Sequence, residues 1–211
     1  MRLIGMLDSP FVRRVAVCLE HHGIAFRHEA VSVFSTFGKF QSINPVVKAP
    51  TLVCDDGTLL MDSSLILQHI EATQTGGRTL WPSDPLQMQY EMRTVGLAQA
   101  ACEKSAQLVY ERNLRPAAAQ HEPWAARVTG QLLAAYRGLE QEIALHPQLF
   151  RRENGHAAIA AAIAWQFTQS LLAQIVPAAD YPGVAGLSAR MERTAQFLKY
   201  PPAGPGVPKP A

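Results

Sequence analysis

The sequence has little charge, no long apolar run and no strong excess of either sign of charge. Charged residues make up 17% of the 211 residues and hydrophobic residues 48%, a composition that excludes an intrinsically disordered chain. Lys and Arg number 19 against 17 Asp and Glu, which favours neither nucleic acid nor an anionic membrane as a partner. No window approaches about 18 uninterrupted apolar residues, so we expect no transmembrane helix.

Cysteine is also scarce, and histidine shows no ligand pattern. Cys18, Cys54 and Cys102 are odd in number and far apart, so they fit neither a disulfide framework nor a Cys-x-x-Cys pair. The seven histidines are scattered without zinc-ligand spacing, and we expect no metal. Asp8 interrupts the first apolar run where a signal peptide would continue. These observations predict a soluble, cytoplasmic globular protein.

The first 75 residues alternate between strand and helix signals. Residues 2–7 are β-prone, and Ser9-Pro10 then offers an N-cap and a proline at the first helical position. Apolar residues at helical spacing follow as far as Gly23, which suits a helix C-terminus. Residues 26–33 read as a second strand. A strand, a helix and a strand in so short a span predict a βαβ unit with parallel strands.

A hairpin and a third helix complete this first part. We expect residues 34–43 to be a loop with an irregular helical turn. Asp55-Asp56-Gly57 lies between two apolar runs, which is a strong hairpin signal. Residues 62–64, Asp-Ser-Ser, then precede apolar positions at helical spacing and predict a capped helix. The order βαβ-ββα predicts a small mixed sheet with helices packed on it.

After a linker the strand signals disappear. Residues 76–85 contain two glycines and two prolines and read as the linker. We therefore predict an α/β domain at 1–75 and an α-helical domain at 86–211. The proline-rich residues 201–211 are expected to form either an ordered cover or a loose tail. The predicted helices span residues 86–113, 124–145, 155–176 and 186–200.

Several motifs occur in order along the chain: Ser-Pro-Phe-Val-Arg at 9–13, Asn-Pro-x-x-Lys-Ala-Pro-Thr-Leu at 44–52, Asp-Gly at 56–57, Asp-Ser-x-x-Ile at 62–66 and Leu-Trp-Pro at 80–82. As an ordered set they resemble the cytosolic glutathione S-transferase superfamily. Within it, the chain resembles a bacterial subfamily with an N-terminal Ser-Pro-Phe-Val-Arg segment and an Arg-Pro-Ala-Ala stretch, here residues 115–118. The resemblance implies a thioredoxin-like N-terminal domain, an α-helical bundle domain, a homodimer, glutathione as cosubstrate and a role in detoxification.

Ser9 is the catalytic residue that this resemblance implies. At the start of the first helix the backbone N–H groups are unsatisfied and the helix dipole is positive, so a sulfur anion is stabilised there. A hydroxyl at this point can also donate a hydrogen bond to the thiolate, and such surroundings lower a thiol pKa from about 8.5. The alternative is that Ser9 merely caps the helix. No tyrosine that could replace it lies in the first 85 residues.

The resemblance also implies a cis peptide bond before Pro50, with the backbone of Ala49 pairing with the cysteinyl part of glutathione like an added strand. The alternative is that Pro50 simply begins a strand. Phe11 is assigned to the same site. Lys48 is the preferred partner of the glycyl carboxylate as a point charge, with Lys39 as the less favoured choice.

The γ-glutamyl end of glutathione carries a carboxylate and an ammonium group on one carbon. Ser63, with the N–H groups of the helix that it opens, is suited to the carboxylate, and Asp62 is suited to the ammonium. The family more often has Glu or Gln at this position, so the shorter Asp62 departs from the pattern. The alternative reading of the Asp-Ser pair is an ordinary helix cap.

We expect the second substrate between the domains, against Tyr110, Arg112 and Arg115, where arginines suit a negatively charged electrophile or product. Trp165 and Phe34 are further candidates, and Arg13 is expected to be structural at the domain interface. The family's Ser/Thr-x-x-Asp capping box is replaced by alanines and isoleucine at 158–161, so Asn154 or His156 is expected to cap that helix instead.

The activity that the resemblance favours is conjugation of the glutathione thiolate to a small electrophile. Two alternatives stay open. One is an isomerase related to maleylacetoacetate isomerase, a class that usually shows several serines before the arginine, whereas here only Ser9 is present. The other is a glutathione-binding or interaction protein without catalysis.

Overall fold

The structure is a computed structural model that describes residues 1–73 and 79–208. It divides into two compact units, Met1–Leu80 with Thr194–Gly206, and Trp81–Arg193 with the residues from 207. Thr194–Gly206 thus belong with the first unit, whereas the sequence prediction placed all of 86–211 in one helical domain. Residues 76–78 of the predicted linker lie outside the described residues.

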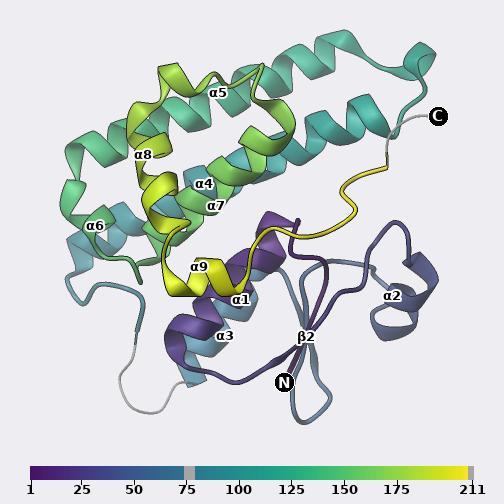
Figure 1. The fold of residues 1–211 in the computed structure, drawn as a ribbon, viewed down its shortest axis with the longest axis horizontal. Helices are drawn as coiled ribbons and strands as arrows, with labels where there is room; N and C mark the ends of the chain where they lie inside the picture. The colour runs from purple at the N-terminus through teal and green to yellow at the C-terminus, as the bar shows by residue number, and fades with distance from the viewer. Residues whose placement is uncertain (74–78, 209–211) are drawn as a thin grey trace. The chain divides into compact units, whose positions relative to one another are not determined.

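The first unit is a thioredoxin-like layer of sheet and helices (Figure 1), which confirms the predicted fold class. The strand order is β2-β1-β3-β4. β1 pairs in parallel with β2, and β3 runs antiparallel to both β1 and β4. Its elements are β1 (Arg2–Ile4), α1 (Pro10–His22), β2 (Arg27–Glu29), α2 (Phe37–Ile43), β3 (Thr51–Val53), β4 (Leu59–Met61), α3 (Ser63–Thr73) and α9 (Ala195–Lys199).

Local sequence signals account for most of these elements. Ser9 is the N-cap residue of α1 and Pro10 its first residue, while Gly23 ends the helix in the left-handed conformation at φ 71°. The segment predicted as a loop differs, because it forms the helix α2 around Phe40. That side chain is fully buried against Ile4 and Val53 of the sheet. Burial of one aromatic ring therefore orders a segment whose local pattern is weakly helical.

The second unit contains only helices and the loops between them in its described part, as predicted. Residues predicted as one helix from 186 to 200 fall in two, α8 (Pro182–Met191) and α9, because the helix stops after Met191 and a new one starts after Thr194. No helix in the described ranges is long and apolar enough to cross a membrane. The helices are α4 (Pro85–Asn113), α5 (Glu122–Leu145), α6 (Pro147–Arg151), α7 (His156–Leu172) and α8 (Pro182–Met191), with short 3₁₀ turns at Ala117–Ala119 and Ala178–Asp180.

A carboxylate from a neighbouring helix caps α7. Glu91 of α4 is fully buried, and its Oε1 accepts a 3.0 Å hydrogen bond from the N–H of Ala157. Its Oε2 lies 3.5 Å from Arg152 Nη1. A Cβ at the N-cap residue, Gly155, would come within 2.9 Å of Glu91 Oε1. Glu91 thus supplies the cap that the sequence prediction assigned to Asn154 or His156.

A carboxylate from another helix also caps α8. Glu140 of α5 accepts hydrogen bonds from the N–H groups of Gly183, at 2.6 Å, and Val184, at 2.9 Å. A Cβ at 183 would lie 2.8 Å from Glu140 Oε1, so a larger residue there would displace this carboxylate. Two helix N-termini of this unit are therefore held by tertiary contacts in place of a local capping box.

Candidate functional site

Three segments of the first unit meet beyond the end of β1. Gly5 directly follows β1 at φ 140°, and a Cβ there would lie 2.6 Å from Val12 Cγ2 and 3.4 Å from Ala49 Cβ. The loop between β1 and α1 therefore packs directly against Ala49. The Ala49–Pro50 peptide bond is cis, as the resemblance implied. Pro50 is buried and Ala49 is half-buried.

Ser9 lies in the loop between β1 and α1, and its hydroxyl makes no hydrogen bond that caps α1. The residue has the extended backbone of an N-cap, φ −74° and ψ 122°, but within the described chain its side chain makes no capping hydrogen bond. Its backbone carbonyl accepts from the N–H of Arg13 at 3.0 Å, so the residue still begins the helix. Pro10, which follows, has no N–H to offer. The geometry therefore does not support the reading that Ser9 is only a side-chain cap.

The start of α3 forms the second part of the site. Asp62 adopts φ 74°, and its Oδ1 accepts a 2.9 Å hydrogen bond from the N–H of Ser64. Its Oδ2 lies 3.8 Å from Lys48 Nζ, and both side chains are close to half exposed. An exposed pair at this distance contributes little to stability, so each partner is available to a ligand at small cost. Two of the predicted binding residues thus lie together.

Ser63 is buried above a guanidinium group that the sequence prediction missed. Nη1 of Arg14 donates to Ser63 Oγ at 3.3 Å and to Ser64 Oγ at 3.1 Å. Ser63 is 2% exposed and Arg14 3% exposed. A serine hydroxyl both donates and accepts hydrogen bonds, so accepting from Arg14 is compatible with a role as a donor. A buried cation behind a helix N-terminus also favours an anion there.

The other predicted residues of this unit lie on α1 and α2 and differ in their exposure. Phe11 is half-buried in the first turn of α1, and Lys39 is exposed on α2. Arg13 is 1% exposed. Its Nε donates to the carbonyl of Tyr200 at 2.8 Å, and its guanidinium lies 5.1 Å from the centre of the Phe197 ring. Arg13 therefore attaches α9 to α1 within the first unit.

The residues predicted to meet the second substrate lie in the second unit, and both arginines have carboxylate partners. Arg112 Nη2 bonds both carboxylate oxygens of Glu122, at 2.9 and 3.1 Å. Arg115 Nε lies 2.9 Å from Glu111 Oε2. An anionic substrate would compete with these ion pairs. Tyr110 is 42% exposed. Their assignment to the substrate stays a prediction.

Trp165, named as a further candidate, is a core residue. It is 6% exposed, and its ring packs edge-on against Tyr136 with 5.4 Å between centroids. Tyr136 in turn donates to the carbonyl of Ala164 at 2.9 Å, and its hydroxyl is hydrogen-bonded to Thr168 Oγ1 at 2.7 Å. This cluster explains why α7 is apolar nearly all round. It fixes α7 against α5 inside the second unit.

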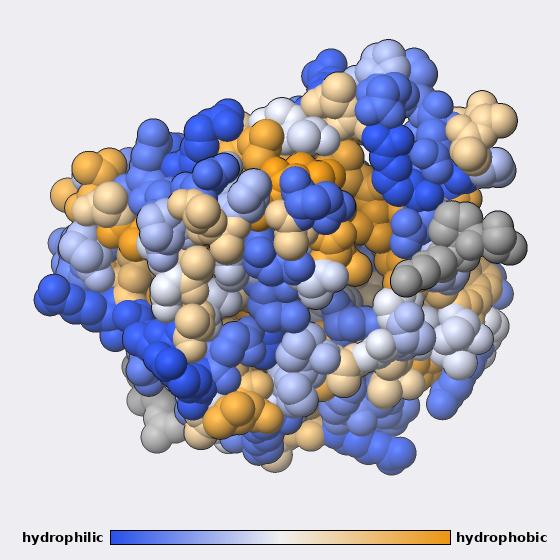
Figure 2. Space-filling model, turned by 45° about the horizontal axis from the view of Figure 1, so that its top comes forward, coloured by the Kyte–Doolittle hydropathy of each residue, from blue (hydrophilic) through white to orange (hydrophobic). Residues whose placement is uncertain are grey.

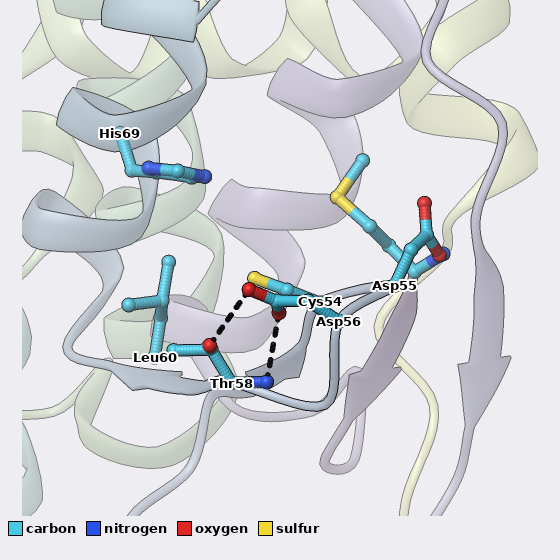
Figure 3. A pocket seen from close by; sticks show the side chains of 7 residues that line it. Cys54, Asp55, Asp56, Thr58, Leu60 and His69 are labelled. Carbon is cyan, nitrogen blue, oxygen red and sulfur yellow. Dashed lines mark hydrogen bonds and ion pairs between the residues drawn. The ribbon is translucent and has the colours of Figure 1, made fainter.

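A pocket of about 320 Å³ lies at the β3–β4 hairpin, a feature that the sequence prediction missed. Figure 3 shows His69 extending toward it from α3, while Cys54 and Asp56 face it from the hairpin. Asp56 accepts from the N–H and the hydroxyl of Thr58, at 2.9 and 3.0 Å, and these bonds lower the pKa of the carboxyl. Among the described residues no group of His, Cys, Asp and Glu could hold a metal ion.

We predict that only Cys54 reacts with iodoacetamide in the folded protein. Burial raises the pKa of Cys18 to about 12, and Cys102 is 2% exposed. The pKa of Cys54 is raised by partial burial and then by the carboxylates of Asp56 and Asp55. Because the thiolate is the nucleophile, alkylation is expected to be slow at pH 7 and to accelerate above pH 9. Mass spectrometry of the alkylated protein measures this.

Asp56→Asn tests the electrostatic part of that expectation. Removing one carboxylate lowers the pKa of Cys54, so alkylation at pH 8 should become about two- to fivefold faster. Glu122→Gln, far along the chain in the second unit, is the matched control and should change nothing. Two or three rapidly labelled cysteines in the native protein would contradict the burial assigned here.

Comparison with known proteins gives the family to which the first unit is similar. Residues 3–78 match the family model described as the glutathione S-transferase N-terminal domain. The uncharacterized GST-like protein YibF of Escherichia coli K12 is 32% identical over 122 residues, which is 58% of this chain and 59% of that protein. The chain thus spans less than two thirds of the length of this curated relative.

Solved structures share the fold over nearly the whole chain. A glutathione transferase family member from Pseudomonas fluorescens Pf-5, with bound S-(propanoic acid)-glutathione, has a TM-score of 0.79 at 24% identity, covering 97% of this chain and 100% of its own. A glutathione S-transferase from Methylobacterium radiotolerans, in complex with glutathione sulfonate, has a TM-score of 0.82 at 24% identity, covering 100% and 95%. These likenesses agree with the two-part fold described above.

Proposed function

We propose that this chain is a glutathione S-transferase-like enzyme that binds glutathione in its first unit and activates the thiol for transfer to a small electrophile. The match of residues 3–78 to the glutathione S-transferase N-terminal domain supports this, as does the similarity to proteins with bound glutathione or its derivatives. The observation that carries the proposal is that Ser9 is the N-cap residue of α1 but its hydroxyl makes no capping hydrogen bond.

In this proposal the thiol of glutathione lies at the start of α1. The Ser9 hydroxyl donates a hydrogen bond to the sulfur, and the positive end of α1 favours the thiolate over the thiol. The cosubstrate brings the nucleophile, so the protein needs no reactive cysteine of its own. Phe11 borders the sulfur, and the backbone of Ala49 pairs with the cysteinyl residue as an added strand.

The two charged ends of glutathione are held at the start of α3 and beside it. The γ-glutamyl carboxylate accepts from Ser63 and lies above the buried guanidinium of Arg14, which is 3.3 Å from Ser63 Oγ. Asp62 meets the ammonium group. Lys48, loosely paired with Asp62 at 3.8 Å, turns to the glycyl carboxylate when glutathione binds.

Tyr110, Arg112 and Arg115 remain the residues that we propose for the second substrate, which is a small electrophile. The proposal also includes a cytoplasmic homodimer with a role in detoxification. Figure 2 shows apolar residues in several groups on a mainly hydrophilic surface, and such groups suit a partner chain. Large hydrophobic side chains that stay more than half exposed include Val46, Leu65, Leu86, Met92, Leu145 and Leu198.

Titration calorimetry with glutathione tests the binding. The wild-type protein is expected to bind, and Ser63→Ala is expected to lower the affinity about tenfold or more, because a hydrogen bond to a charged group contributes about 1.5–3 kcal/mol. Ser64→Ala is the matched control: this hydroxyl also accepts from Arg14 but is exposed, and its loss should change affinity less than about twofold.

Two results would count against the proposal. Absence of binding at millimolar glutathione would contradict the function itself. Equal affinities for wild type and Ser63→Ala would leave the function standing but remove Ser63 from the binding site.

A further inference from the structure

The residues after α9 lie across the loop that carries Ser9. We call residues 201–206 the strap; Figure 1 draws it in yellow, passing the start of α1. It belongs to the first unit. Its sequence, Pro-Pro-Ala-Gly-Pro-Gly, contains three prolines. Because proline restricts the unfolded chain, such a segment loses little conformational entropy when it is held in place.

Asp8 is the residue that the strap contacts. The N–H of Asp8 donates to the carbonyl of Ala203 at 3.1 Å, and its carboxylate Oδ2 accepts from the N–H of Gly206 at 2.8 Å. Between these two points, a Cβ at Gly204 would lie 2.0 Å from Asp8 Oδ2 and 2.2 Å from its Cγ. The strap therefore follows the Asp8 side chain so closely that a side chain at 204 would force the Asp8 carboxylate or the strap to shift.

The Asp8 carboxyl is partly withdrawn from water by this contact. Burial raises the pKa of Asp8, while the hydrogen bond from Gly206 acts in the opposite direction. Burying a carboxylate costs free energy, and the hydrogen bond from the N–H of Gly206 offsets that cost. Asp8 therefore favours the position of the strap in which this bond forms.

We propose that Asp8 is a positioning residue for Ser9: by holding the strap, it fixes the loop from which the Ser9 hydroxyl meets the glutathione thiol. The effect on the glutathione thiol rests on the proposed function, whereas the contact between Asp8 and the strap does not. Asp8 directly precedes Ser9, so anchoring both the N–H and the carboxylate of Asp8 restrains the backbone that aims the Ser9 side chain. A displacement of about 1 Å in a catalytic group can cost on the order of a hundredfold in rate.

Two substitutions break the contact from opposite sides. Gly204→Ala places a methyl group against the Asp8 carboxylate, so either the strap lifts or the carboxylate leaves the N–H of Gly206. Asp8→Ala removes the anchor. Each is expected to speed amide hydrogen exchange in residues 6–9 about tenfold or more. Each is also expected to raise the pKa of bound glutathione, read from the pH–rate profile, by about one unit, with glutathione affinity changed less than about threefold.

Three further variants test whether the effects come from the contact between Asp8 and the strap. Because both substitutions break one contact, the double variant should be no worse than either single one. Asp8→Asn keeps an oxygen that can accept from Gly206 and should resemble wild type. Gly130→Ala, where an added Cβ meets nothing within 4 Å, is the control for glycine replacement.

Several outcomes would overturn the inference. Faster exchange confined to the strap, with residues 6–9 and the thiol pKa unchanged, would show that the strap does not act on Ser9, and so would additive effects in the double variant. If wild type binds no glutathione, the proposed function fails, while the exchange measurement, made without glutathione, still decides whether the strap orders the Ser9 loop.

Discussion

Replacing Ser9 by alanine is expected to lower the rate of glutathione conjugation about a hundredfold. A hydrogen bond to a charged group contributes about 1.5–3 kcal/mol, and the upper part of that range corresponds to a factor of about a hundred. The same loss raises the pKa of bound glutathione by about one to two units. Steady-state kinetics with a chlorinated dinitrobenzene, measured across pH, give both quantities.

The control for this experiment is Ser9→Thr, which keeps the hydroxyl and should retain most of the activity. Glutathione affinity should change less than about threefold in both variants, because in the proposed binding mode Ser63 and Asp62 hold the other end of the tripeptide. Full activity of Ser9→Ala would contradict the role of Ser9. A wild-type protein that binds glutathione but conjugates no electrophile would favour the non-catalytic alternative.

Replacing Glu91 by alanine is expected to destabilise the second unit by about 3 kcal/mol. The carboxylate is fully buried, and its loss leaves the N–H of Ala157 without its acceptor and removes the 3.5 Å contact to Arg152. For a chain of this size we expect the melting temperature to fall by about 6–12 °C. Thermal unfolding followed by circular dichroism measures this.

Glu140→Ala provides the matched comparison, since Glu140 caps α8 by the same kind of contact. Its carboxylate is less buried, so the loss should be close to that of an ordinary N-cap, about 1–2 kcal/mol. Glu91→Gln keeps one acceptor oxygen and should fall between wild type and Glu91→Ala. Equal, small effects of all three substitutions would show that α7 does not depend on this cap.

The sequence predicted the elements whose signals are local. Ser9-Pro10 and Gly23 mark both ends of α1, and Asp56-Gly57 marks the β3–β4 hairpin; each acts through its own backbone conformation. The break between α8 and α9 was missed because it has no proline or glycine. The helix α2 was missed because one buried ring, Phe40, stabilises it from outside the segment.

In the candidate site, too, residues with local signals were predicted and residues with distant partners were missed. Ser9, Asp62 and Ser63 were predicted because the family resemblance gives a site role to residues that the local sequence marks only as helix starts. Arg14 and Asp8 were missed because their partners are distant in the chain: Arg14 contacts a residue 49 positions away, and Asp8 one 198 positions away. Their signals were an arginine pair within an apolar helix and an acid directly before the serine.

A crystal structure of the protein soaked with glutathione tests the central claim most directly. The account predicts the glutathione sulfur within about 3.5 Å of Ser9 Oγ, with the γ-glutamyl carboxylate within hydrogen-bond distance of Ser63. A sulfur more than about 4 Å from Ser9 Oγ, beyond the reach of a hydrogen bond, would contradict it.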